Sequence, residues 1–244
     1  MVLAAGRGER MRPLTDATPK PLLHVRGKPL LQWHVDALAR DGFTNIVINT
    51  AWLGEQIPAH FGLQPLSDLR QPLSISYSHE GLDFGGALET AGGIVRALPL
   101  LSDVFWVLAG DVFAPDFVFS PAAVQRFVAS GKLAHLWLVP NPAHNPKGDF
   151  GLTPDPTTPG PQLAVNQADI KYTYSTIGLY RRELFEPPWC DVLTGNPQGV
   201  KTALAPLLRR AMDNQLISAE LYLGAWTDVG TPERLAQLNQ TEPS

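Results

Sequence analysis

Residues 3–23 bring together, in one short segment, the groups that bind a polyphosphate. The segment holds Gly6, Gly8, three arginines and Lys20, which stands between two prolines. Glycine lets backbone N–H groups approach phosphate oxygens closely, arginine binds such oxygens through paired hydrogen bonds, and lysine adds a point charge. The pattern favours a loop that binds a highly anionic ligand such as a nucleoside triphosphate. A flexible surface loop with solvated charges is the simpler alternative.

Two aspartates lie where a divalent cation could be held. Asp111 follows the continuous apolar run 104–109, which predicts a buried strand, and Asp228 precedes the Gly-Thr-Pro that begins the last helix. Carboxylates at the ends of strands suit Mg²⁺, which proteins bind through one or two carboxylates together with substrate phosphates. The alternative for each aspartate is a turn or helix cap.

These residues are positioned by a predicted alternation of strands and helices up to residue 139. Strands are expected at 1–5, 45–50, 73–80, 104–112 and 133–140, and helices at 29–42, 52–62, 89–101 and 121–130. This order predicts an α/β fold with a Rossmann-like, doubly wound and mostly parallel sheet flanked by helices. Ligands bind outside the carboxyl ends of strands in such sheets, where the opening loop and Asp111 would lie.

The second half of the chain is less regular. Residues 140–171 are rich in Pro, Asp, Thr and Gly and predict loops or hairpins. A strand is expected from 173, a helix at 201–215, a hairpin at 216–229 and a helix capped by Thr231 at the end. We expect a single domain over 1–244, with residues 140–244 forming the acceptor side.

Composition excludes several classes of function. The formal net charge of −4 over 244 residues argues against nucleic-acid binding. One cysteine, Cys190, excludes a disulfide framework, and the six histidines show no zinc-ligand spacing. There is no apolar run long enough to span a membrane, so a cytoplasmic protein without a membrane partner is expected. Oligomeric state is left open.

The opening segment resembles the signature of the sugar-1-phosphate nucleotidyltransferases, L-A-A-G-x-G-x-R-[ML]-x-P-L-T-x-x-x-P-K-P. The matched positions are Gly6, Gly8, Arg10, Met11, Pro13, Leu14, Thr15, Pro19, Lys20 and Pro21. The resemblance continues at 109–112 and 226–235, so it covers essentially the whole chain. Residues 49–57 and the ETAGGI segment look most like the N-acetylmuramate 1-phosphate uridylyltransferases of cell-wall sugar salvage, or peptidoglycan recycling.

The resemblance implies the nucleotide-diphospho-sugar transferase fold and transfer of a nucleotidyl group to a sugar 1-phosphate, with release of pyrophosphate. It makes Lys20 and Arg10 catalytic, and Asp111 and Asp228 ligands of Mg²⁺. It divides the domain into a nucleotide-binding half, 1–139, and a sugar-binding half, 140–244. The implied nucleotide-binding residues are Leu3, Ala4, Ala5, Gly6, Gly8, Glu9, Arg10, Lys20, Glu80, Thr90 and Gly92, and the implied sugar-binding residues are Asp149 and Thr176.

The sequence departs from the family pattern in the base and sugar segments. GLDFGGA, residues 81–87, is longer than the usual linker, so either Glu80 or Glu89 could face the base. Thr176 stands where the family usually has glycine. A lactyl carboxylate would want a cation, for which the candidates are Lys147, Lys171, Arg181 and Lys201. UTP with N-acetylmuramate 1-phosphate is favoured; a guanylyl- or thymidylyltransferase for another sugar, or a regulatory module without turnover, are the alternatives.

Overall fold

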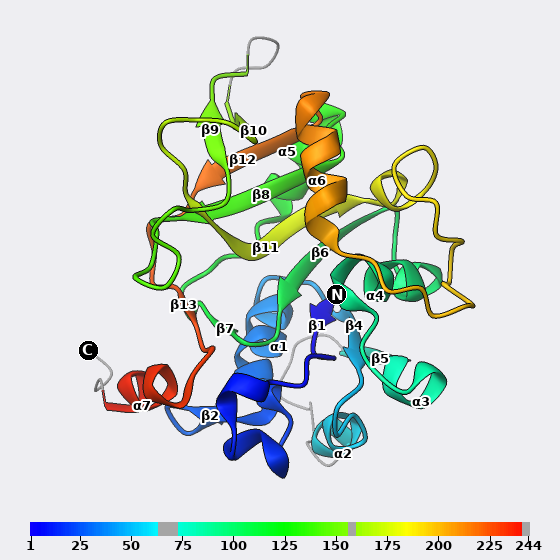
Figure 1. Ribbon diagram of the computed structural model, residues 1–244, viewed down its shortest axis with the longest axis vertical. Coiled ribbons are helices and arrows are strands. Elements are labelled where there is room, and N and C mark those ends of the chain that lie inside the picture. The colour runs from blue at the N-terminus through cyan, green and yellow to red at the C-terminus, as the bar shows by residue number, and fades with distance from the viewer. Residues whose placement is uncertain (63–72, 156–159, 241–244) are drawn as a thin grey trace. The chain divides into compact units, whose positions relative to one another are not determined.

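The computed structural model describes residues 1–62, 73–155 and 160–240, which form two compact units (Figure 1). The first unit comprises the described parts of Met1–Leu88, Ala109–Phe119 and Ala225–Ser244, and the second those of Glu89–Leu108 and Ser120–Gly224. Each unit is assembled from segments that are distant in sequence, so the units do not coincide with the predicted halves. Within the described residues, every helix is too short or too polar to cross a lipid bilayer.

The first unit contains the opening loop and a small parallel sheet. The strands of this unit are β1 (Val2–Leu3), β2 (His24–Val25), β3 (Lys28–Pro29), β4 (Asn45–Thr50), β5 (Ser74–His79), β7 (Val112–Phe113) and β13 (Thr227–Asp228). Its helices are α1 (Leu30–Arg40), α2 (Gln56–Gly62), α3 (Glu80–Phe84) and α7 (Pro232–Gln240), with 3₁₀ turns η1 (Glu9–Met11), η2 (Leu14–Asp16) and η3 (Lys20–Leu22).

Strands β5, β4 and β1 lie side by side in that order, and both pairs are parallel. Five of the six β4 residues are buried, as the β-branched run NIVINT predicts for a parallel strand covered on both faces. Helix α1 buries Leu30, Leu31, Val35 and Leu38 at helical spacing and ends at Asp41 and Gly42. The predicted parallel, helix-flanked arrangement is therefore confirmed in this unit.

One cluster of buried side chains holds the opening loop and the β7–β13 pair together. It consists of Met11, Leu23, Val25, Leu30, Phe113, Val229 and Leu235. These residues come from η1, the turn after η3, β2, α1, β7, the residue that follows β13, and α7. The position of the loop relative to Asp111 and Asp228 is consequently set by close packing, which resists displacement.

Among its described residues, the second unit contains six strands and three helices. The strands are β6 (Val104–Ala109), β8 (Ala134–Val139), β9 (Gly151–Thr153), β10 (Gln162–Val165), β11 (Thr173–Arg181) and β12 (Ile217–Leu221). The helices are α4 (Glu89–Ala97), α5 (Pro121–Ser130) and α6 (Leu204–Asp213), with η4 (Leu98–Leu100) and η5 (Arg182–Phe185). Helix α6 packs against β10 and β12 (Figure 1).

The strand order in this unit is β6-β11-β8-β12-β10-β9, and only β8 and β12 are a parallel pair. Strands β6 and β8 run in the same direction, as the predicted parallel sheet requires, but they are not neighbours, because β11 lies between them and is antiparallel to both. The predicted hairpin at 216–229 is wrong. Its first strand, β12, pairs with β8 and β10, and its second, β13, pairs with β7.

Candidate active site

The opening loop is folded tightly against itself. Gly8 has a φ of 67° and precedes η1, and its carbonyl accepts the Met11 N–H at 2.9 Å and the Thr15 hydroxyl at 2.8 Å. Thr15 is buried, and its own carbonyl accepts the Trp52 indole N–H at 2.9 Å. These bonds satisfy the backbone locally, so the loop is an ordered structure rather than a flexible chain with solvated charges.

Lys20 is buried although it carries a charge. Its side chain is 9% exposed, and Nζ lies 2.6 Å from Oδ2 of Asp111. A Cβ at Gly8 would lie 3.1 Å from Lys20 Cβ, so the absence of a side chain at Gly8 makes room for the lysine stem. A buried ammonium requires a partner of opposite charge, and Asp111 provides one. The sequence-based alternative of a solvated surface lysine is therefore wrong.

Arg10 lies in η1 and is exposed. No other described residue forms an ion pair or hydrogen bond with its guanidinium. Arg7, by contrast, stacks over Trp52 at 4.0 Å and lies 3.4 Å from Glu9. Of these three charged residues, Arg10 is the one left available to an anion.

The backbone at the end of β1 is already partly occupied by protein groups. The Ala4 N–H donates to Oδ1 of Asn49 at 2.8 Å, and the Leu3 carbonyl accepts the Gly110 N–H at 2.8 Å. Gly6 is exposed, and a Cβ there would have no neighbour within 4 Å. Of the predicted backbone cradle, Gly6 and Gly8 are therefore the open positions.

Asp111 and Asp228 are brought together by the β7–β13 pair. Val112 lies opposite Asp228, and the Val229 N–H donates to the Asp111 carbonyl at 3.0 Å. Their side chains are 36% and 23% exposed. The described residues hold no group of three or more His, Cys, Asp or Glu that could bind a metal on its own. Two accessible carboxylates fit Mg²⁺, because substrate phosphates commonly complete its coordination.

Each aspartate also has a cation beside it. Lys20 contacts Asp111, and Arg234 Nη1 donates to Oδ2 of Asp228 at 2.9 Å and to the Asp228 carbonyl at 2.8 Å. Arg234 lies in α7, so the last helix fixes the second aspartate. The sequence gives no direct indication of this role for Arg234.

Glu80 does not face an open site. It is fully buried; Oε1 accepts Nδ2 of Asn49 at 2.7 Å, and Oε2 accepts the Leu88 N–H at 2.8 Å. The predicted contact of Glu80 with a base is therefore replaced by a positioning role. Asn49, which the sequence reasoning missed, links β1 to Glu80. The available signal was a polar amide directly after the apolar run 46–48 of β4, since buried amides need partners.

Thr90 and Gly92 lie in the first turn of α4, in the second unit. The N–H groups of Ala91 and Gly92 both donate to the Thr202 carbonyl, at 2.9 and 3.0 Å, and the Gly92 carbonyl accepts Nδ2 of Asn196. The Gly92 backbone is thus held by protein partners. Thr90 is half-buried, and Glu89 is exposed.

Of the two predicted sugar-binding residues, Thr176 lies on β11, and Asp149 lies before β9 and bonds to the backbone of β11. Asp149 accepts the Tyr174 N–H at 2.8 Å and Nδ2 of Asn145 at 3.2 Å. Thr176 lies two residues after Tyr174, where the pairing of β11 with β8 shifts register, and its φ is 63°. This left-handed conformation disfavours a β-branched residue and explains why glycine would suit the position.

The four candidate cations differ in their surroundings. Lys147 and Lys201 are exposed, and Lys171 is half-buried. Arg181 instead binds backbone carbonyls, with Nε on Lys132 at 2.8 Å and Nη2 on Val128 at 2.6 Å. Arg181 thereby caps the last turn of α5 and is a structural group.

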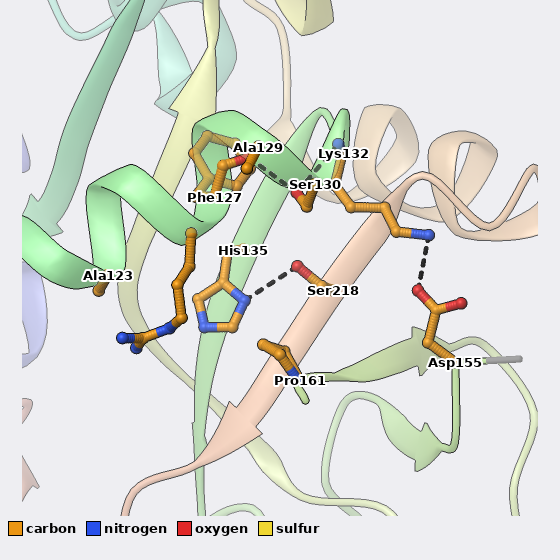
Figure 2. Close-up of a pocket in the computed structure, with 10 residues that line it drawn as sticks. Ala123, Phe127, Ala129, Ser130, Lys132, His135, Asp155, Pro161 and Ser218 are labelled. Atoms are coloured by element: carbon orange, nitrogen blue, oxygen red, sulfur yellow. Dashed lines mark hydrogen bonds and ion pairs between the residues drawn. The ribbon is translucent and has the colours of Figure 1, made fainter. Parts of the chain in front are cut away.

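A separate cavity of about 270 Å³ lies in the second unit and contains none of the predicted site residues (Figure 2). His135 and Ser218 face each other across 2.9 Å, and Lys132 lies 2.9 Å from Asp155 (Figure 2). Burial, together with the charge of Arg126, lowers the pKa of His135 to about 4. His135 is thus paired with Ser218, and Lys132 with Asp155, within the protein.

Known proteins resemble this chain over its whole length. The family model described as nucleotidyl transferase matches residues 1–244. The chain is 46% identical over 243 residues to the N-acetylmuramate alpha-1-phosphate uridylyltransferase of Neisseria meningitidis serogroup B, covering 97% of this chain and 95% of that protein. It is 29% identical over 238 residues to mannose-1-phosphate guanyltransferase beta-A of Xenopus laevis, covering 96% of this chain and 61% of that protein.

A solved structure shares the fold. The UDP-glucose pyrophosphorylase from Acinetobacter baumanii matches with a TM-score of 0.73 at 15% identity, covering 98% of this chain and 90% of that one. This likeness confirms the predicted fold class.

Proposed function

Because the chain belongs to the nucleotidyl transferase family, we propose that it transfers the uridylyl group of UTP to N-acetylmuramate α-1-phosphate. A phosphate oxygen of the sugar attacks the α-phosphorus of UTP, the bond from that phosphorus to the β-bridging oxygen breaks, and pyrophosphate leaves. The product is UDP-N-acetylmuramate. The observation that carries this proposal is the 46% identity, over nearly the full length of both chains, to a relative with that activity in its name.

The arrangement of Lys20 supports its role at the reacting phosphates. Transfer between two anions depends on positioning and charge neutralisation more than on covalent catalysis. Lys20 is buried, fixed by Gly8 and Asp111, and presents its ammonium at the base of the loop. We assign it to the α-phosphate and the incoming sugar phosphate. Arg10, which is exposed on η1, is assigned to the leaving pyrophosphate.

Asp111 and Asp228 would hold Mg²⁺. The donor set fits, because both carboxylates are partly exposed on one strand pair and are hard oxygen ligands. When bound, Mg²⁺ supplies positive charge and a fixed orientation for the phosphate oxygens. Lys20 and Arg234 hold the two carboxylates in place from either side.

The sugar is proposed from the relative, and Asp149 and Thr176 are assigned to its hydroxyls. The exposed Lys147 and Lys201 and the half-buried Lys171 remain candidates for the lactyl carboxylate. A cytoplasmic role in peptidoglycan recycling goes with this substrate. A regulatory module without turnover is disfavoured, because a module that only binds a sugar nucleotide needs no buried lysine–aspartate pair beside a second aspartate.

The test is pyrophosphate release with Mg²⁺, using UTP, GTP, CTP, ATP and dTTP against the α-1-phosphates of N-acetylmuramate, N-acetylglucosamine, glucose and mannose. The expected maximum is UTP with N-acetylmuramate 1-phosphate. If turnover were highest with another pair of nucleotide and sugar phosphate, the proposed substrates would be wrong, but the proposed nucleotidyl transfer would still hold. Binding of UTP by folded protein without turnover on any sugar would favour the regulatory module.

Lys20→Ala tests the mechanism, with Lys28→Ala as the matched control. Both lysines lie 2.6 Å from an aspartate, but Lys28 and Asp36 are largely exposed. Loss of Lys20 is expected to reduce turnover at least about 100-fold, whereas loss of Lys28 leaves it near the wild-type value. Wild-type turnover in a folded Lys20→Ala variant would remove the proposed mechanism.

A further inference from the structure

The turn that follows β4, at residues 51–56, contacts the opening loop at two points. The indole N–H of Trp52 donates to the carbonyl of Thr15 at 2.9 Å, and Nε2 of Gln56 donates to the carbonyl of Ala17 at 3.0 Å. Both carbonyls belong to the part of the loop that leads to the buried lysine. The turn therefore braces the loop from outside, although the proposed chemistry gives it no role.

The turn is itself tightly built. Leu53 has a φ of 49°, in the left-handed region, and the Gly54 N–H donates to the Ala51 carbonyl at 3.2 Å. A Cβ at Gly81, the second residue of α3, would lie only 2.6 Å from the Ala51 oxygen. The start of α3 therefore packs directly against the turn, which makes the turn a fixed support for the loop.

The indole of Trp52 is held by a cation as well as by its hydrogen bond. The guanidinium of Arg7 lies over the indole ring, 4.0 Å from the centroid, and Nε of Arg7 lies 3.4 Å from Glu9. An arginine stacked on an indole is attracted by the negative face of the ring. The stack restrains the plane of the indole, and with it the direction of the N–H that binds Thr15.

The carbonyl that Trp52 binds belongs to a residue that packs beside the catalytic lysine. Thr15 is 2% exposed, and its hydroxyl donates to the Gly8 carbonyl at 2.8 Å. A Cβ at Gly8 would lie 3.0 Å from Cγ2 of Thr15 and 3.1 Å from Cβ of Lys20, so the Gly8 backbone is packed between these two side chains. Because close-packed atoms resist displacement, a shift of Thr15 is transmitted through Gly8 to Lys20.

We propose that Trp52 is a positioning residue for Lys20, acting through the carbonyl of Thr15 to fix the loop against which the lysine stem packs. The support of the loop stands independently of the chemistry, whereas the consequence for turnover rests on the proposed function. In this role Trp52 contacts no substrate. Gln56 is a weaker second support, because its bond to Ala17 is exposed and competes with water.

Trp52→Phe removes the indole N–H and keeps an aromatic ring under Arg7, and Trp33→Phe is the matched control. The Trp33 indole donates to the carbonyl of Val25 at 3.1 Å, and Nζ of Lys28 lies over its ring at 4.5 Å. The same substitution thus removes the same kind of bond beneath the same kind of stack. Both indoles are half-buried, so each variant is expected to lose about 2–4 °C of melting temperature.

The first readout is amide hydrogen exchange at Leu23, whose N–H donates to the Lys20 carbonyl at 3.1 Å. This bond reports local opening of the backbone that carries the lysine, and it can be followed without any turnover. Exchange is expected to be at least roughly fivefold faster in Trp52→Phe and within about twofold of wild type in Trp33→Phe.

The second readout is kcat for pyrophosphate release from UTP and N-acetylmuramate α-1-phosphate. A displacement of about half an ångström is expected to lower kcat roughly tenfold in Trp52→Phe, whereas Trp33→Phe should stay within about twofold of wild type. Thr15→Val removes the hydroxyl bond to Gly8, keeps the shape of the side chain and should cost a similar factor. If Trp52 acts through Thr15, the double variant loses roughly 10–20-fold and not the product of about 100-fold.

Wild-type exchange at Leu23 in folded Trp52→Phe overturns the proposal, and so does faster exchange with an unchanged kcat. Equal losses of kcat in the two tryptophan variants, or a fully additive double variant, also contradict it, because destabilisation or a separate route would then explain the loss. The proposed function is judged on the wild-type protein. If the wild type turns over no pair of nucleotide and sugar phosphate, that function fails, and exchange at Leu23 alone decides the role of Trp52.

Discussion

Gly8→Ala tests whether the opening loop positions Lys20. The substitution has two costs. First, Gly8 has a φ of 67°, where alanine is disfavoured by about 1–2 kcal/mol, offset by roughly 0.4–1 kcal/mol from the stiffer unfolded chain. Second, the new Cβ would lie 3.0 Å from Cγ2 of Thr15 and 3.1 Å from Cβ of Lys20.

The second cost comes from packing and can be separated from the first. Carbon atoms prefer about 3.5–4.0 Å, so Thr15 or Lys20 must move by a few tenths of an ångström or more. Thr15 is buried and bonded to Gly8, and such overpacking costs about 1–3 kcal/mol. The free energy of unfolding of Gly8→Ala is therefore expected to fall by about 2–4 kcal/mol.

Gly42→Ala is the matched control. Gly42 has a φ of 89°, and a Cβ there would have no neighbour within 4 Å, so only the backbone cost applies. We expect a loss of about 0.5–1 kcal/mol by the same arithmetic. Denaturant unfolding measures both variants, and the difference between them isolates the packing against Thr15 and Lys20.

Turnover provides the functional half of the test. A displacement of about half an ångström at Lys20 is expected to lower kcat roughly tenfold, since misplacement by about 1 Å can cost about 100-fold. Pyrophosphate release is measured well below the melting temperature of each variant, where Gly42→Ala should match wild type. The reasoning would be refuted if the two variants lost the same free energy of unfolding and the turnover of Gly8→Ala stayed within about twofold of wild type.

Two further predictions concern the second unit. Thr176→Gly should raise the free energy of unfolding by up to about 1 kcal/mol, because relief of the left-handed conformation exceeds the entropy cost of glycine. Thr153→Gly, in the ordinary strand β9, is the control and should lower the free energy of unfolding. The two variants are compared by their denaturant midpoints. In the folded protein the pKa of His135 is lowered to about 4, so its imidazole is neutral at higher pH. In the unfolded chain the same imidazole takes up a proton below about pH 6.5. The free energy of unfolding should therefore fall as the pH falls from about 6.5 to about 4. His135 contributes about 1.4 kcal/mol per pH unit to this fall in the free energy of unfolding. Melting curves of His135→Gln should therefore show a shallower dependence of stability on pH than those of the wild type. The same dependence in both proteins would contradict the assignment.

The ordered conformation of the opening loop could be predicted from sequence because it depends on local residues. Glycine, proline and basic residues in residues 3–23 limit the backbone that can form, and the spacing of Gly8 and Lys20 leaves little freedom in how the loop folds. The helices and most strands were predicted for the same reason, since periodicity reports which face of an element is buried.

Periodicity does not say which element covers that face. The apolar strands β6 and β8 gave no sign that β11, from much later in the chain, lies between them. The run 216–229 was predicted to pair with itself, although β13 pairs with β7. Strand pairing depends on contacts between distant segments, and these are decided only when the chain packs.

The sequence by itself determined the composition and local fold of the opening loop and the residue types that the proposed chemistry requires. Tertiary structure alone decided that the β7–β13 pair brings Asp111 and Asp228 together, and that the carboxylate of Glu80 is buried against Asn49. The physical reason is that a buried polar group must find a partner, and which partner it finds is determined by the whole packed unit.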